Sequence, residues 1–136
     1  MQEFYLKRIR QLEPCALVET KVAQGLEDRY AERIKEIEAK NLEKHLEDDY
    51  IICLSDEGKE MSSKDFARLL EKRSLNSPGT TFVVGGFAGL AERITRRGDF
   101  LLSLSRLTYS HELCRVVLLE QIYRALTIMK GKHYAK

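Results

Sequence analysis

Three short runs of apolar residues have the composition of buried strands, and segments with helical periodicity separate them. The runs cover residues 50–54, 81–84 and 100–104, and they are rich in β-branched, aromatic and aliphatic side chains. Nearly continuous apolar strands are typical of a parallel sheet that is covered on both faces. A fourth run, residues 15–22, also fits a strand. Residues 55–58, Ser-Asp-Glu-Gly, are expected to form the turn after the run at residues 50–54. Strands that alternate with helices therefore predict an α/β fold with a mainly parallel sheet.

Helical spacing of apolar residues predicts further elements between and before these strands. One helix covers residues 3–12 and stops near Pro14, and another covers residues 26–46, where many Glu and Lys side chains form a solvated face. Ser62 is expected to cap a third helix, with Asp65 as part of a capping box and with Met61 and Phe66 at hydrophobic-staple spacing. A fourth covers residues 90–97. These helices would supply the layers that cover the sheet.

The last predicted helix, residues 112–130, is apolar around most of its circumference. One apolar stripe along the helix consists of Val116, Leu119, Ile122, Leu126 and Met129. Four more apolar residues widen this stripe: Leu113, Val117, Leu118 and Ala125. A helix of this kind is buried on more than one side. Its apolar surface is too wide for one side of a monomer, so we expect a homodimer through this helix and its neighbours. Gly131 is expected to end it, as glycine does directly after a C-cap.

Composition narrows the class of protein. The chain has 136 residues, 43% hydrophobic and 32% charged, which fits a single globular domain over residues 1–136 and argues against disorder. Its apolar runs are too short to span a bilayer, and Met1 is not followed by a signal-peptide pattern. Cys15, Cys53 and Cys114 are odd in number and lack zinc spacing, so we interpret them as reduced thiols of a cytosolic protein. The net charge of +2 is nearly neutral, so binding of any nucleic acid would require a local basic patch.

A glycine-rich stretch follows the strand at residues 81–84. Gly85 and Gly86 come directly after the strand, Gly89 comes three residues later, and a helix follows. Adjacent glycines at the carboxyl end of a strand leave room for a ligand to approach the backbone. Taken alone, such a stretch is more often an ordinary turn, and its spacing is not the dinucleotide fingerprint. In an open α/β sheet, however, strand, glycine turn and helix are the usual setting of a ligand crevice.

The blocks that follow this stretch resemble a known family. The run Leu-Leu-Ser-Leu-Ser-Arg-Leu-Thr at residues 101–108, then His111, the apolar helix and the ending Gly-Lys-His-Tyr-Ala-Lys occur in that order. Their order and spacing are similar to those of the SPOUT-class large-subunit rRNA pseudouridine N3-methyltransferases, the methyltransferase H family. The resemblance is specific from about Leu54 to the C-terminus and weaker before it. It implies a C-terminal trefoil knot, a homodimer, the cofactor S-adenosyl-L-methionine, and methylation of N3 of a pseudouridine in 23S rRNA of the assembled ribosome. By the same comparison, we expect the family's N-terminal strand to be missing from this chain.

The resemblance places the cofactor in the loops after three strands. By position, it implies binding by Leu54, Gly85, Gly86, Gly89, Leu104, Ser105, Arg106, Leu107, Thr108 and Tyr109. Backbone groups exposed by the glycines suit an adenine and a ribose, and the leucines suit an apolar floor. All three loops follow strands of one predicted sheet, which favours a binding site over three unrelated turns.

The candidate catalytic residues are Tyr134, His133, His111 and Arg115. The imide nitrogen must lose its proton to attack a methyl group, and the tyrosine and the two histidines are the groups that we expect near that proton. Arg115 is a candidate contact for RNA phosphate or for the partner subunit, and Lys136 is another for phosphate. No covalent nucleophile and no metal is required.

Several of these residues also have structural interpretations. His111 fits a structural residue at the start of the last helix as well as a catalyst. Glu120 and Arg124 lie one turn apart and can pair with each other. Arg93, Arg96 and Arg97 either contact phosphate or form a solvated helix face, which is the commoner case. The family's usual ending is Tyr-His-Lys, whereas Ala135 follows Tyr134 here, and Ser110 stands where a proline is common. A non-catalytic module that binds RNA or dimerises, and keeps the knotted cofactor pocket, is therefore the alternative function.

Overall fold

The computed structural model describes residues 1–13, 31–44, 46, 50–74, 79–85 and 89–131. The helices are α1 (Gln2–Arg10), α2 (Ala31–Glu43), α3 (Ser63–Ser74), α4 (Glu92–Arg97) and α5 (His111–Met129), and the strands are β1 (Tyr50–Lys59), β2 (Thr80–Val83) and β3 (Phe100–Leu102). Each lies where the sequence predicts an element of the same type, although several are shorter than predicted. The expected strand at residues 15–22 falls outside the described residues.

The strands form a parallel sheet in the order β2-β1-β3, so the central strand is the first of the three in the chain. Ile51 pairs with Thr81 of β2 on one side, and Leu54 pairs with Leu102 of β3 on the other. Both pairings are parallel, which confirms the predicted strand direction for these three strands. Their carboxyl ends therefore lie at one edge of the sheet.

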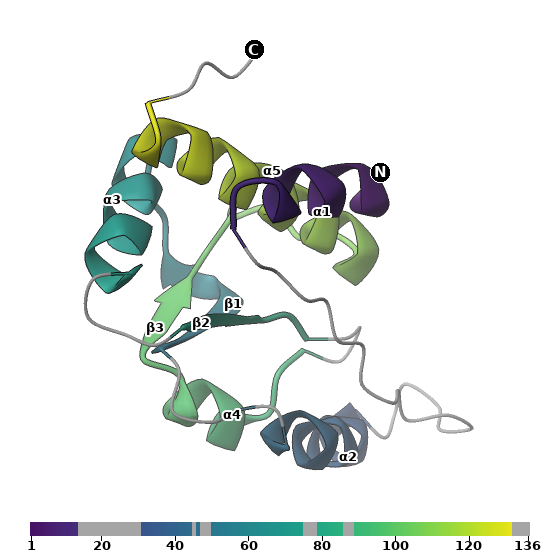
Figure 1. The fold of residues 1–136 in the computed structure, drawn as a ribbon. Coiled ribbons are helices and arrows are strands. Elements are labelled where there is room, and N and C mark those ends of the chain that lie inside the picture. The colour runs from purple at the N-terminus through teal and green to yellow at the C-terminus, as the bar shows by residue number, and fades with distance from the viewer. Residues whose placement is uncertain (14–30, 45, 47–49, 75–78, 86–88, 132–136) are drawn as a thin grey trace.

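Helices cover both faces of this sheet (Figure 1). Ile52 and Leu54 of β1 face α3 and α5, in a cluster that also holds Phe66, Leu70, Leu102, Leu118 and Ala125. Ile51 and Cys53 alternate with them and face α2 and α4, in a cluster with Ala39, Val83, Ala91 and Ile94. Ile51, Ile52 and Cys53 are fully buried. The continuous apolar run of β1 is thus explained, since it meets a separate core on each face.

Helix α5 is enclosed by two other helices of the same chain. Leu118 and Ala125 join the core shared with α3, whereas Leu119 and Leu126 pack against Leu6 and Ile9 of α1. The remaining large apolar side chains at its surface include Leu113 and Ile128, which are 49% and 45% exposed. The prediction that α5 is buried on more than one side is confirmed, and α1 accounts for part of the width that the sequence analysis assigned to a second subunit.

Both ends of α5 follow simple capping rules. The Ser110 hydroxyl accepts a hydrogen bond from the Leu113 amide at 3.1 Å, as an N-cap serine does. At the other end Gly131 has a φ of 67°, in the left-handed region that glycine adopts most easily. The prediction that Gly131 ends the helix is confirmed.

The end of β1 differs from the expected turn at residues 55–58. The strand continues to Lys59 with an irregular register, since both Leu54 and Lys59 pair with Leu102. The Ser103 amide then donates to the Lys59 carbonyl at 3.0 Å. At Gly58 an added Cβ would lie 2.7 Å from the carbonyl carbon of Leu101, so only glycine permits this approach. The bulged segment therefore stays attached to β3 instead of leaving the sheet.

Candidate functional site

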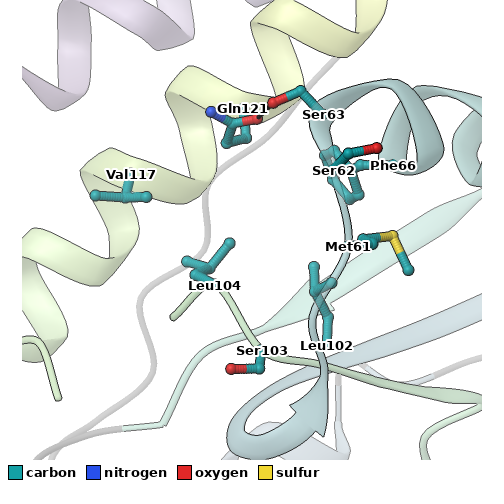
Figure 2. A pocket seen from close by; sticks show the side chains of 9 residues that line it. All are labelled: Met61, Ser62, Ser63, Phe66, Leu102, Ser103, Leu104, Val117 and Gln121. Atoms are coloured by element: carbon teal, nitrogen blue, oxygen red, sulfur yellow. Dashed lines mark hydrogen bonds between the residues drawn. The ribbon is translucent and has the colours of Figure 1, made fainter. Parts of the chain in front are cut away.

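A pocket of about 180 Å³ lies at the carboxyl edge of the sheet, between the start of α3, the end of β3 and the middle of α5 (Figure 2). Its lining is formed by Met61, Ser62, Ser63, Phe66, Leu102, Ser103, Leu104, Val117 and Gln121. Ligand pockets for drug-sized molecules usually measure about 300–1,000 Å³. This one has room for a ring-sized part of a ligand, and apolar and polar side chains share its lining about evenly.

The α3 side of the pocket is fixed by a capped helix start. The Ser62 hydroxyl accepts from the Asp65 amide at 3.1 Å, and the Ser62 carbonyl accepts from the Phe66 amide at 2.9 Å. Ser62 is therefore the N-cap, as predicted. Ser63, the first helical residue, is not needed for capping, and its hydroxyl donates to the side-chain oxygen of Gln121 on α5 at 2.7 Å.

The loop between β3 and α5 is held by its own hydrogen bonds. The buried Ser103 hydroxyl donates to the Ser105 carbonyl at 3.0 Å, and the Ser105 hydroxyl accepts from the Leu107 amide at 2.9 Å. Arg106 reaches across to Glu60, before α3, with an Nε to Oε1 distance of 2.9 Å. The Leu107 side chain, by contrast, is 72% exposed. The loop is thus ordered by polar contacts while it presents an apolar side chain outward.

The glycine turn after β2 is shaped by contacts within itself. An added Cβ at Gly85 would lie 2.9 Å from the carbonyl carbon of Gly89, closer than real Cβ atoms approach. Gly89 has a φ of 84°, which side chains other than glycine rarely adopt. Gly85 is therefore glycine because the Gly89 backbone lies against it, and Gly89 because of its own backbone conformation. Gly86 lies outside the described residues.

The ends of the three predicted strands meet at one apolar cluster. Leu54 of β1 is a buried member of the core between the sheet, α3 and α5, and Leu104 from the loop after β3 packs against the same core. Val84, directly before Gly85, packs against it as well. The structure therefore brings the last residue of each of the three predicted strands to a common core, although Leu54 lies within β1 and not at its end, because β1 continues to Lys59. Of the residues expected to bind the cofactor, Arg106, Leu107 and Thr108 are exposed, and Ser105 and Tyr109 are half-buried.

Sequence reasoning did not select two polar residues of this pocket. Ser63 and Gln121 lie 58 positions apart and are joined by a side-chain hydrogen bond. Gln121 is a polar residue in the most apolar helix of the chain, and that contrast is a signal that sequence analysis can use. Ser63 stands beside the N-cap serine, so its separate role was not visible from the sequence.

The candidate catalytic residues are only partly described. His111 is exposed at the first position of α5, and Arg115 is half-buried one turn further along. His133, Tyr134 and Lys136 lie outside the described residues. Glu120 and Arg124 form the predicted pair, with two guanidinium nitrogens donating to one carboxylate oxygen at 3.1 and 2.8 Å.

Two arginines of α4, Arg93 and Arg96, form ion pairs with neighbouring carboxylates. Arg93 pairs with Glu36 and Glu43 of α2, and Arg96 pairs with Glu92. These ion pairs connect α4 to α2 and along α4 itself. They favour the structural interpretation of Arg93 and Arg96 over phosphate contacts.

Burial favours the protonated form of the Cys53 and Cys114 thiols. Burial, and secondarily the charge of Asp99, raises the pKa of the Cys53 thiol to about 11, and its Sγ lies 3.7 Å from the Ile94 carbonyl. Burial also raises the pKa of the Cys114 thiol. Within the described ranges, no group of His, Cys, Asp and Glu side chains is arranged to hold a metal ion. No helix in the same part of the chain is long and apolar enough to cross a membrane.

Comparison with known proteins places this arrangement in a family. A family model described as "Predicted SPOUT methyltransferase" matches residues 1–135. The chain belongs to the SPOUT methyltransferase family. The resemblance inferred from the sequence motifs is thereby confirmed, and the match also covers the residues before Leu54, where the motifs are weaker.

Individual SPOUT methyltransferases are similar over the same length. Ribosomal RNA large subunit methyltransferase H of Caldicellulosiruptor saccharolyticus is 36% identical over 135 residues, covering 98% of this chain and 88% of the relative. The protein of the same name from Streptococcus agalactiae is 38% identical, covering 96% of this chain and 84% of the relative. That from Thermodesulfovibrio yellowstonii is 39% identical, covering 97% and 84%.

Proposed function

We propose that this SPOUT family member uses S-adenosyl-L-methionine to methylate N3 of a pseudouridine in 23S rRNA of the assembled ribosome. The observation that carries the proposal is the similarity, over almost the full chain, to proteins named ribosomal RNA large subunit methyltransferase H. The meeting of the strand ends at one pocketed edge of a parallel sheet supports it, because ligands of open α/β sheets bind at that edge.

The residues of this edge suit the proposed cofactor. The proposal assigns its binding to Leu54, Gly85, Gly86, Gly89 and the loop Leu104, Ser105, Arg106, Leu107, Thr108 and Tyr109. The pocket beside Leu104 is lined by apolar side chains together with three serines and Gln121, which suits a ring with polar edges. When bound, the cofactor supplies an electrophilic methyl group.

The chain's own contribution to methyl transfer would be positioning and one proton transfer. His133, Tyr134 and His111 are the proposed groups near the N3 proton, and Arg115 and Lys136 are proposed to orient RNA phosphate. The raised pKa values of Cys53 and Cys114 keep both thiols protonated, so they are unsuited to act as nucleophiles near neutral pH.

We further propose one cytoplasmic domain over residues 1–136, with a trefoil knot in its C-terminal half, that acts as a homodimer through α5. Leu113 and Ile128 support the dimer, since both are large apolar side chains of α5 that remain about half exposed in the single chain. Sedimentation at micromolar concentration should show a dimer. A stable monomer at that concentration would contradict this part of the proposal.

The activity is tested with purified protein, labelled S-adenosyl-L-methionine and ribosomes that lack the modification. Transfer of label to 23S rRNA, with the methylated base mapped to N3 of a pseudouridine, is the expected result. A variant lacking residues 133–136 should keep cofactor affinity and lose methyl transfer, because two of the three proposed proton-handling groups, His133 and Tyr134, are removed. Binding of the cofactor without any transfer by the full chain would favour the non-catalytic alternative instead.

A further inference from the structure

The pocket at the carboxyl edge lies where the packing between α3 and α5 gives way to a polar contact. Deeper in the core the two helices meet through Phe66, Leu70, Leu118 and Ala125. At the pocket, Val117 and Gln121 face it from successive turns of α5, while Ser63 and Phe66 face it from α3 (Figure 2). The hydrogen bond from the Ser63 hydroxyl to Gln121 Oε1, 2.7 Å long, crosses between the helices at this point.

The orientation of the Gln121 amide is set by its other neighbour. Its nitrogen donates to Glu120 Oε1 at 2.8 Å, and Glu120 Oε2 accepts from Arg124 at 3.1 and 2.8 Å. Turning the amide over would place its oxygen against a carboxylate, which has no proton to donate. The Glu120 and Arg124 pair therefore holds the Gln121 oxygen toward Ser63, and the contact between the helices has one preferred geometry.

The geometry points to Ser63 and Gln121 as a positioning pair that sets the width of this pocket, and thereby the affinity for the cofactor. Ser63 is free for this role because Ser62 already caps α3. Leu104, on the opposite wall, belongs to the loop that is proposed to hold the cofactor. A change in the spacing of α3 and α5 would therefore move the wall against which that loop rests. This inference rests on the proposed function, because the ligand it invokes is S-adenosyl-L-methionine.

Calorimetric titration with S-adenosyl-L-methionine tests the pair. Ser63→Ala and Gln121→Leu should each raise the Kd about fivefold, the usual effect of one lost hydrogen bond. The double variant should raise it no further, since both changes remove the same contact. Ser63→Thr, which keeps the hydroxyl, should bind almost as the wild type does. The KM for ribosomes should stay unchanged in all of them, a split that a general loss of stability would not produce.

Thr127→Val is the matched control. Thr127 is a buried residue of α5 whose hydroxyl donates to the Arg124 carbonyl, and it does not line the pocket. Its loss removes a hydrogen bond of the same helix and should leave the Kd at the wild-type value. A Kd within twofold of wild type in both Ser63→Ala and Gln121→Leu, or strictly additive losses in the double variant, would overturn the positioning role.

The outcome for the wild-type protein separates this inference from the proposed function. A wild-type chain that binds the cofactor but methylates no ribosome contradicts the proposed function alone, and the comparison of Kd values still decides the role of the pair. A wild-type chain that binds no cofactor overturns both. A wild-type chain that binds and methylates, with variants that bind equally well, overturns the positioning pair alone.

Discussion

Gly85 and Gly89 are required in the same segment for two different physical reasons, a close contact at Gly85 and a positive φ at Gly89. Substitutions at the two positions can separate these reasons. At Gly89 an added Cβ meets only Lys35 Cε at 3.8 Å, so Gly89→Ala has space but must hold a φ near 84°. A left-handed conformation costs an alanine about 1–2 kcal/mol. At Gly85 the added Cβ of an alanine lies 2.9 Å from the Gly89 carbonyl carbon and 3.1 Å from Leu90 Cγ, so the cost is steric, roughly 1–3 kcal/mol.

If the proposed cofactor binds only the native turn, these costs appear in its affinity. Gly89→Ala should raise the Kd for S-adenosyl-L-methionine about 5- to 30-fold. Gly89→Asn should recover part of this loss, because asparagine tolerates the left-handed region better than alanine. Calorimetric Kd values, with urea unfolding of each variant in parallel, give both quantities. At Gly85 no side chain can restore the affinity, since the backbone of Gly89 occupies the space.

Gly131→Ala provides the control for backbone strain. Gly131 has a φ of 67° and no atom within 4 Å of an added Cβ, but it lies at the end of α5. The Gly131→Ala variant should lose about as much stability as Gly89→Ala and should keep the wild-type Kd for S-adenosyl-L-methionine. Equal losses of affinity in Gly89→Ala and Gly89→Asn would show that positive φ is not the cause. Wild-type Kd values in both Gly85→Ala and Gly89→Ala would remove this turn from the cofactor site.

Two further predictions concern stability. Ser62→Ala should lower the free energy of unfolding, measured in urea, by about 1 kcal/mol, because the Asp65 amide loses its acceptor. Ser62→Asp should retain most of the wild-type stability, since aspartate also caps helices. Equal losses in both variants would contradict the capping role. The pKa of Cys53 is raised from 9.0 to about 11, so the native state keeps a proton that the unfolded state releases. The stability advantage of wild type over Cys53→Ala should therefore be complete below pH 9 and shrink by up to about 3 kcal/mol as the pH rises to 11, and a constant advantage across that window would refute this.

The sequence predicted those elements whose signals are local. Apolar runs located β1, β2 and β3, and capping residues located the start of α3 and the end of α5. The segment at residues 55–58 shows the limit of local signals. Its Ser, Asp, Glu and Gly residues are turn formers, yet the chain remains in β1 because Lys59 and Gly58 meet β3 more than 40 positions later. Pairing with a distant strand overrode the local preference.

The sequence predicted some residues of the candidate site and missed others. The missed residues depend, like the end of β1, on contacts between distant parts of the chain. Leu54 and Leu104 were selected from loops after strands, and the structure joins them at one core. Ser63 and Gln121 depend on the packing of α3 against α5, which no local pattern reveals. The sequence left open whether Arg93 contacts phosphate or lies on a solvated helix face. Its partners Glu36 and Glu43 lie on α2, so they become visible only when α2 and α4 are placed.

The packing of α1 on α5 has a consequence for synthesis. Leu6 and Ile9 are each 1% exposed in the folded chain, and they are covered by Leu119 and Leu126, near the other end of the sequence. At a translation rate of about 5–20 residues per second, roughly 5–20 seconds separate the two helices. During that time the apolar face of α1 has no native partner from α5. Helix α1 therefore emerges well before α5 can cover it, and the contacts between the two helices raise the contact order, which slows folding.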